Sequence, residues 1–112
     1  MLRVVTFVRF CAGLDAEQAF RRWQTHTDTW DRRDHPEIVR TRLVRFDAGG
    51  GLGYDGFAET VWPSREAFDQ AAAWYQEPAS ATHYADLCEF LDMDGSQTVV
   101  IEEDCVLDGN PR

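Results

Sequence analysis

Residues 2–10, Leu-Arg-Val-Val-Thr-Phe-Val-Arg-Phe, decide the fold, because they predict a strand that is bulky on both of its faces. The alternating positions are Val5 and Phe7 on one face and Val4, Thr6 and Val8 on the other. A single layer of helices can cover only one face of a sheet. A second copy of the chain is the simplest cover for the other face, since two identical sheets meeting about a two-fold axis close a barrel around a cavity.

A helix is predicted after the break at residues 11–13. Asp15 and Gln18 have the spacing of a capping box, and the helix should run from Asp15 to about Thr27. Its apolar side chains, at positions 19, 20 and 23, form one stripe that continues to His26. Imidazole exchanges protons near neutral pH, so His26 is the first candidate for catalysis. The alternative is a histidine that caps the helix or satisfies a polar contact in the core.

The middle of the chain predicts two more strands. Residues 29–36 are polar and predict an irregular connection, and Ile38 to Asp47 follow as the second strand. The glycine-rich stretch 49–53 predicts a mobile hairpin tip rather than a phosphate-binding loop, because it joins two strands and not a strand to a helix. Tyr54 to Trp62 alternate and predict the third strand.

The second half repeats the order of the first. Ser64 begins a predicted helix whose apolar stripe ends at Tyr75, a further helix spans about Ser80 to Leu91, and residues 97–107 predict the last strand. The order is that of an α+β, ferredoxin-like βαββαβ fold, with a four-stranded antiparallel sheet and the helices on one face. We expect one domain over residues 1–107 and a frayed tail over 108–112.

Composition excludes several functions. The 112 residues carry a net charge of -9, which opposes binding to nucleic acid or to an anionic membrane surface. No apolar run is long enough to span a bilayer and the start lacks the features of a signal peptide, so we expect a cytoplasmic protein. The three cysteines are widely spaced and predict reduced, packed thiols. All eleven basic residues are arginine, so Schiff-base chemistry on lysine is excluded.

Three motifs follow one another along the chain. They are Phe20-x-x-Trp23-x-x-His26, Asp55-Gly56-Phe57-Ala58-Glu59-x-x-Trp62, and Asp86-x-x-x-Phe90-x-Asp92. In this order they resemble the EthD family of dimeric α/β-barrel proteins, over about residues 2–106. The resemblance implies a ferredoxin-like fold, a homodimer and a pocket between sheet and helices. It also implies that His26 matches a helical histidine thought to shuttle a proton in related methylisomerases.

Glu59 is the second predicted catalytic residue. It is in phase with Asp55, Phe57 and Val61, whereas the small residues of the same strand occupy the opposite face, where helices would pack. Glu59 should therefore point into the barrel, where a carboxylate serves as an acid, a base or a group that orients a histidine. The alternative is an ion pair across the sheet with Arg9, Arg40 or Arg42.

An aromatic lining is predicted around these residues, suited to a flat or phenolic ligand. The candidate substrate-binding residues are Phe7, Trp23, Trp30, Phe57, Tyr75, His83 and Tyr84. Core packing is the alternative for each aromatic residue. His83 is predicted either as a second acid of the pocket or as a surface residue, and His35 as solvent-exposed. The spacing of histidines and carboxylates predicts no metal site, and no cofactor-binding motif is present.

The leading hypothesis is a cofactor-independent enzyme of secondary or aromatic metabolism. It would cyclise, isomerise or dehydrate a polyketide-like or lactone substrate by proton transfer. The alternatives are a cofactor-free monooxygenase of a hydroquinone-like substrate and a non-catalytic module that binds a small hydrophobic molecule.

Overall fold

The computed structural model describes residues 1–47 and 52–109. Its elements occur in the order β1 (Leu2–Phe10), α1 (Ala16–His26), a π-helical turn (Thr27–Asp31), α2 (Arg32–Asp34), β2 (Arg40–Arg45), β3 (Gly56–Trp62), α3 (Arg65–Trp74), a 3₁₀ turn (Pro78–Ser80), α4 (Ala81–Cys88) and β4 (Leu91–Ile101). Most of the predicted hairpin tip, residues 49–51, and the end of the predicted tail, residues 110–112, lie outside the described residues.

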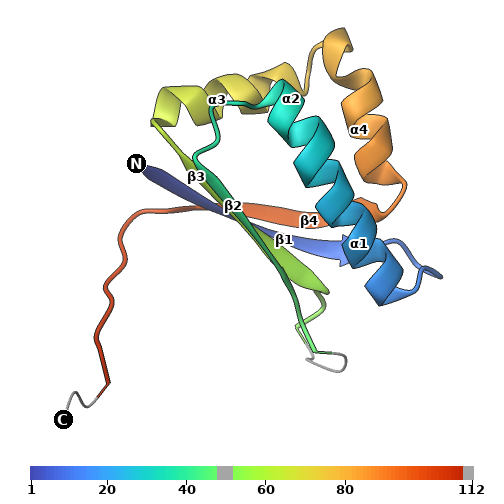
Figure 1. The fold of residues 1–112 in the computed structure, drawn as a ribbon, viewed down its shortest axis with the longest axis horizontal. Coiled ribbons are helices and arrows are strands. Elements are labelled where there is room, and N and C mark those ends of the chain that lie inside the picture. Colours follow the sequence, from blue (N-terminus) through green and yellow to red (C-terminus); the bar gives the residue numbers. More distant parts are fainter. Residues whose placement is uncertain (48–51, 110–112) are drawn as a thin grey trace.

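The strands form one antiparallel sheet in the order β2-β3-β1-β4. Within residues 1–47 and 52–109, the helices lie on one face of this sheet and no element covers the opposite face (Figure 1). This confirms the predicted α+β, ferredoxin-like arrangement.

The helix starts predicted at Asp15 and Ser64 are confirmed. The Asp15 carboxylate accepts a hydrogen bond from the Gln18 backbone amide, and the Ser64 hydroxyl accepts one from the Ala67 amide. Each bond satisfies an amide that has no partner within its helix.

The prediction of an irregular connection over residues 29–36 is wrong for most of its length. The backbone stays helical to Asp34, first through the π-helical turn and then through α2. Arg32 pairs with Asp28 at 2.7 Å, one turn away, so the polar residues form the solvated side of a helix rather than a loop.

β4 begins six residues earlier than predicted and also ends earlier. Leu91 and Asp92 already pair with Phe10 and Arg9, and the register then shifts at a bulge. Gly95 lies in this bulge, where a Cβ would come within 2.8 Å of the Arg9 side chain. The polar residues of the bulge concealed the strand, because they break the alternation by which it would be recognised.

The apolar core lies between the sheet and the helices. Val8, Phe10, Trp23 and Phe90 belong to one buried cluster, and Trp62 is in a second cluster nearer the start of β1. The uncovered face carries a mixture of apolar and charged side chains, assigned by strand register: Arg3, Val5, Phe7, Arg40, Arg42, Val44, Phe57, Glu59, Val61, Gln97, Val99 and Ile101.

Residues 102–109 leave the body of the molecule without regular secondary structure (Figure 1). An ion pair of 2.6 Å between Arg3 and Asp104 holds their first part near β1. None of the helices in the described parts of the chain has the length and apolar character needed to cross a membrane.

Candidate active site

Two buried histidines from different helices meet inside the helical layer. His26 is the last residue of α1 and His83 lies in the first turn of α4, and each is 1% exposed. Their Nε2 atoms are 3.1 Å apart, with the rings nearly perpendicular. The structure therefore places His26, the first predicted catalytic residue, beside His83. Of the two roles predicted for His83, a surface position is excluded.

A carboxylate holds the outer nitrogen of each ring. His26 Nδ1 donates to Asp86 Oδ2 at 2.7 Å, and His83 Nδ1 donates to Asp34 Oδ2 at 2.8 Å. Arg33 in turn makes two hydrogen bonds to Asp34, of 3.0 and 3.1 Å. Because an ionised carboxylate only accepts hydrogen bonds, both Nδ1 atoms carry protons and both Nε2 atoms face the centre.

Asp31 completes the centre. Its Oδ1 lies 3.2 Å from His83 Nε2 and 3.6 Å from His26 Nε2. Asp31 is five residues after His26, and in a regular α-helix side chains five residues apart lie on different sides. The π-helical turn over Thr27–Asp31 aligns residues five apart, and so brings the carboxylate over the ring.

These contacts shift the pKa values of the groups involved. Burial raises the pKa of Asp31, but hydrogen bonds with His26 and His83 outweigh it, so the pKa lies below its usual range. Burial lowers the pKa of His83, but hydrogen bonds to Asp31 and Asp34 reverse the direction and raise it. The Arg33 hydrogen bond is the main cause that lowers the pKa of Asp34 to about 2. At neutral pH the centre therefore favours ionised carboxylates around a proton-holding imidazole.

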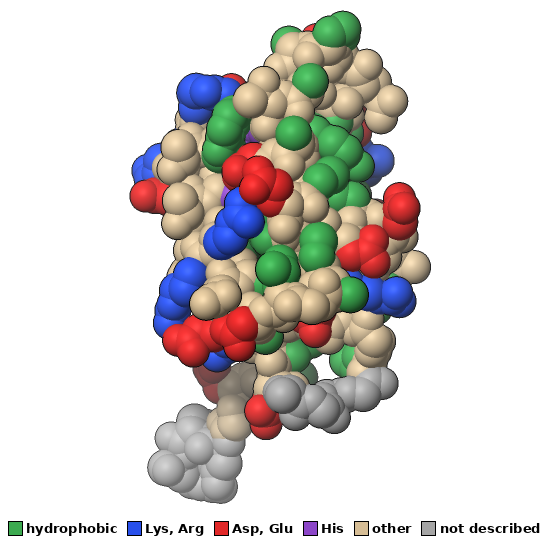
Figure 2. Space-filling view, turned by 90° about the vertical axis from the view of Figure 1, so that its right-hand side faces the viewer, with side chains coloured by type: hydrophobic (Ala, Val, Ile, Leu, Met, Phe, Trp, Pro, Cys, Tyr) green, Lys and Arg blue, Asp and Glu red, His purple; other side chains and the backbone are tan. Residues whose placement is uncertain are grey.

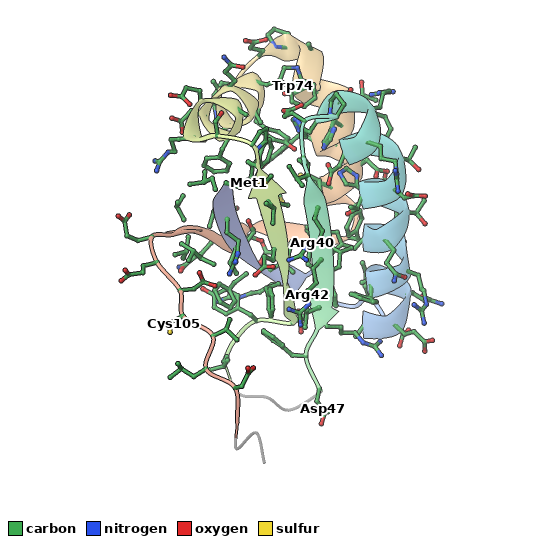
Figure 3. All side chains as sticks on the ribbon, turned by 60° about the vertical axis from the view of Figure 1, so that its left-hand side comes forward. Met1, Arg40, Arg42, Asp47, Trp74 and Cys105 are labelled. Carbon is green, nitrogen blue, oxygen red and sulfur yellow. The ribbon has the colours of Figure 1, made fainter. Side chains whose placement is uncertain are left out.

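An aromatic side chain links the pair to the third histidine. The Tyr75 hydroxyl lies 3.1 Å from His83 Nε2 and 3.0 Å from His35 Nε2. Trp74 lies within the helical layer near these rings (Figure 3), with its ring centroid 5.1 Å from that of His35 and 5.3 Å from that of His83. Burial, followed by the charges of the nearby carboxylates, raises the pKa of the Tyr75 hydroxyl.

The prediction that His35 is solvent-exposed is wrong. The ring is 5% exposed, because α2 continues the helical layer and turns residue 35 inward against Trp62 and Trp74. Burial, opposed only in part by neighbouring carboxylates, lowers the pKa of His35.

A cleft of about 700 Å³ lies between the first helical segment and the edge strand β2. Asp31 and His35 are part of its wall, so the cleft reaches the histidine centre through the carboxylate. Its other walls combine polar and apolar residues: Gln24, Thr27, Asp28, Arg32, Pro36, Ile38, Val39, Arg40, Thr41 and Leu43. On the side of the molecule shown in Figure 2, acidic, basic and apolar side chains are interspersed and little histidine reaches the surface.

Glu59 lies on the uncovered face of the sheet, as its alternation predicted. It is opposite Val5 on β1 and Arg42 on β2, and its carboxylate is 3.5 Å from Arg40. Arg40 and Arg42 follow β2 in Figure 3. The ion pair that was the alternative role for Glu59 is thus present, and Asp86, not Glu59, orients His26.

The predicted aromatic lining is divided among four places. Trp30 and Tyr75 lie at the histidine centre, with the Trp30 ring stacked at 6.4 Å from His26. Phe7 and Phe57 contact each other on the uncovered face, and Trp23 packs in the core against Phe10 and Phe20. Tyr84 is 41% exposed and lines a second hollow of about 410 Å³, with Cys11 and Cys88.

Sequence reasoning missed the three aspartates and the role of His35. Asp86 belongs to one of the quoted motifs and is three residues after His83, on the same helix, so its spacing was a usable signal. Asp31 and Asp34 lie in the segment whose polar residues predicted an irregular connection, which concealed their helical spacing. Contacts between α1 and α4 that join residues about sixty positions apart leave no trace in local periodicity.

No family model matches the sequence, and no curated protein matches it. Solved structures do match. The protein At3g17210 from Arabidopsis thaliana is 16% identical with a TM-score of 0.68, covering 96% of this chain and 99% of that one. SnoaB from Streptomyces nogalater, a cofactor-independent oxygenase, is 20% identical with a TM-score of 0.59, covering 96% and 98%. A dimeric ferredoxin-like protein of unknown function from Jannaschia is 15% identical with a TM-score of 0.61, covering 91% and 98%. At these identities the likeness is one of fold, and this chain has the ferredoxin-like fold that such dimeric proteins share.

Proposed function

We propose that this chain is a small-molecule enzyme of the EthD type that moves protons with its own side chains, so as to cyclise, isomerise or dehydrate a polyketide-like or lactone substrate. The observation that carries the proposal is the buried pair of Nε2 atoms, 3.1 Å apart, with a carboxylate behind each ring. Such backing fixes the tautomer and stabilises the imidazolium that forms when a proton arrives.

The geometry supports a relay. With protons on both Nδ1 atoms, the Nε2 lone pairs of His26 and His83 share one proton that either ring can release. Asp31 contacts both rings and also forms part of the cleft wall. In this proposal the Asp31 carboxylate contacts the substrate, and the histidine pair takes up the proton and returns it, with His26 as the carrier.

The cleft favours a small, partly polar substrate. Its volume of about 700 Å³ lies within the ordinary range for ligand pockets. Hydroxyl and amide side chains in its wall, at Gln24, Thr27 and Thr41, offer hydrogen bonds to carbonyl or hydroxyl groups. The apolar part, at Ile38 and Leu43, is suited to a ring or a short chain.

We further propose that two copies pair through the uncovered sheet face. Val5, Phe7, Phe57 and Val99 supply apolar contact there, and the fold neighbours include dimeric proteins. Glu59 would then lie in the chamber between the two sheets. We keep it as a candidate acid or base for a substrate bound in that chamber.

Proton exchange at carbon tests the proposal before the substrate is known. The protein is incubated in D₂O with a panel of β-dicarbonyl compounds and lactones, and NMR follows replacement of C–H by C–D. His26→Gln should slow the exchange by about 10²-fold or more, the usual contribution of a general acid–base group.

Arg65→Gln is the control, because Arg65 is exposed, pairs with Asp69 on α3 and lines neither site, and Glu59→Gln tests the alternative location. If C–H exchange is lost in His26→Gln and changes little in Glu59→Gln, the reaction takes place in the helical layer. If exchange is lost in Glu59→Gln and changes little in His26→Gln, the reaction takes place between the sheets. Equal exchange in the wild type and a folded His26→Gln variant would refute the assignment.

Oxygen insertion is the second candidate, because SnoaB shares the fold and tryptophans surround the histidine centre. Oxygen uptake that depends on a hydroquinone-like substrate separates it from proton transfer. Saturable binding with neither exchange nor oxygen uptake would instead support the non-catalytic binding module.

A further inference from the structure

We infer that His26, Asp31 and His83 form a binding site for one divalent transition-metal ion of the zinc type. One ligand atom from each residue lies within 4.8 Å of the other two. The three separations are 3.1 Å between the Nε2 atoms, 3.2 Å from His83 Nε2 to Asp31 Oδ1, and 3.6 Å from His26 Nε2 to Asp31 Oδ1. Ligand atoms bound to zinc at tetrahedral positions lie about 3.3–3.5 Å apart, so the triangle already has the required size.

The orientation of the rings is a second, independent observation. Each histidine directs Nε2 to the centre because its Nδ1 donates to a carboxylate, Asp86 for His26 and Asp34 for His83. A carboxylate on the outer nitrogen is the usual arrangement behind a metal-bound histidine, since it fixes the tautomer and increases the basicity of the ligand atom.

Charge and burial also favour a cation. Asp31 contacts both rings, Asp86 contacts that of His26 and Asp34 that of His83. Arg33 contacts Asp34 and compensates the charge of that carboxylate. Two imidazoles and one carboxylate select a borderline ion such as Zn²⁺ or Co²⁺ over Mg²⁺ or Ca²⁺, which prefer oxygen ligands alone. Three protein ligands leave a coordination position for water or a substrate oxygen.

The inference rests on this geometry and not on the proposed function. A bound ion occupies the same lone pairs that hold the proton in the relay, so the metal-loaded and proton-loaded centres are alternative states. The proton relay and the metal site can therefore be refuted independently of each other. Exchange that persists after complete removal of metal supports the relay, and stoichiometric metal binding supports the site whatever reaction is found.

The test uses the full chain after treatment with a chelator and dialysis. Titration with Co²⁺ should produce intense visible ligand-field bands that saturate at one ion per chain, and Zn²⁺ should displace Co²⁺ and abolish them. Asp31→Asn and His83→Gln should each lower the affinity for Zn²⁺, measured by calorimetry, by at least about 10-fold. Asp86→Asn should lower it by about 10- to 100-fold, the usual cost of losing the partner of a metal-bound histidine.

Asp28→Asn is the matched control. It makes the same charge change in the same π-helical turn, but Asp28 is exposed and pairs with Arg32, so the affinity should stay unchanged. Circular dichroism verifies that each variant is folded, and Asp31→Asn, which keeps the shape of the side chain, decides the matter if His83→Gln does not fold. Absence of Co²⁺ bands in the folded wild type would overturn the inference. So would equal affinity in the wild type and Asp31→Asn, which would locate the ion at another acidic group or a cysteine.

Discussion

At the scale of single residues, the centre of the helical layer is a polar network in an apolar surrounding. His26, His35 and His83 are all buried, yet within the described parts of the chain every buried side-chain nitrogen and oxygen has a hydrogen-bond partner. A buried polar group without a partner would cost about 1–3 kcal/mol, so His26 and His83 depend on the carboxylates at positions 31, 34 and 86, and His35 depends on the Tyr75 hydroxyl.

Asp86→Asn tests whether the Asp86 carboxylate contributes to catalysis through His26 or only fills space in the buried centre. Asparagine still offers a carbonyl oxygen to His26 Nδ1, but it lacks the negative charge that stabilises the imidazolium form of the ring, and its NH₂ competes for the same position. We expect proton exchange with an active compound to fall by about 10-fold or more, with partial recovery in Asp86→Glu.

Glu89→Gln serves as the comparison for Asp86→Asn. It removes a charge from the C-terminal end of the same helix, but Glu89 pairs with Arg22 at the surface. An equal decrease in both variants would show that Asp86 acts through general charge and not through the ring that it contacts.

His35 should make the free energy of unfolding depend on pH. Its pKa is lowered in the folded state, mainly by burial, so the unfolded chain binds a proton more readily. The carboxylates near the ring, at positions 31, 34 and 37, oppose this shift in part, and His83 adds to it. Stability from this residue is therefore full above the unfolded pKa of about 6.5, and is lost as the pH falls below that value.

Urea unfolding of the wild type and His35→Gln at about pH 7 and about pH 5 measures this contribution. The difference in free energy of unfolding between the two proteins should shrink on acidification. The wild type then loses the stability that comes from neutral, buried His35, and the variant has no such contribution to lose. A difference that stays constant, or grows, between the two pH values would contradict the lowered pKa of His35.

At the scale of elements, the π-helical turn after α1 is the feature that builds the centre. It lets the chain remain helical from Ala16 to Asp34 while residues five apart come onto one side. This continuous helical segment supplies His26, Asp31 and Asp34, and α4 supplies the partners His83 and Asp86.

Gly56→Ala should weaken the pairing of β2 with β3. A Cβ at Gly56 would overlap the Val44 backbone carbonyl oxygen on the neighbouring strand, and a backbone atom within a sheet cannot move aside cheaply. We expect a loss of about 1–3 kcal/mol in the free energy of unfolding, the range for overpacking. Gly109→Ala, where the added carbon would meet nothing within 4 Å, should change the value little in the same urea titration.

At the scale of the whole molecule, the helices cover one sheet face and leave the other without a layer (Figure 1). Val99 is 50% exposed on the uncovered face, and Phe7 and Phe57 pack there beside Tyr54. An apolar patch of this kind on a sheet is typical of an interface between subunits.

Val99→Asp should therefore weaken the proposed homodimer by about 10²-fold or more, because an unpaired charge buried in an apolar interface costs several kcal/mol. Leu14→Asp adds the same charge in the loop before α1, away from the uncovered face, and should leave association unchanged. Light scattering across a concentration series measures both. A wild type that stays monomeric at high concentration would contradict the pairing.

Local chemistry determined much of this protein before any contact between distant residues was known. The capping residues Asp15 and Ser64 set the helix starts, and alternation in residues 2–10 and 54–62 set the strands and the outward face of Glu59. These signals act over a few residues, so the sequence displays them directly, and the order of elements then leaves few topologies open.

Only the tertiary structure decided what surrounds His26. The approach of α4 to α1 turned His83 inward, and the π-helical turn placed Asp31 in a segment whose polarity predicted a loop. Polar residues favour solvent unless partners from elsewhere in the chain compensate their burial, and those partners are 57 and 60 positions away from His26. The sequence by itself therefore determined the layered fold and the first histidine, and packing between helices decided that this histidine belongs to a buried centre able to hold a proton or a metal ion.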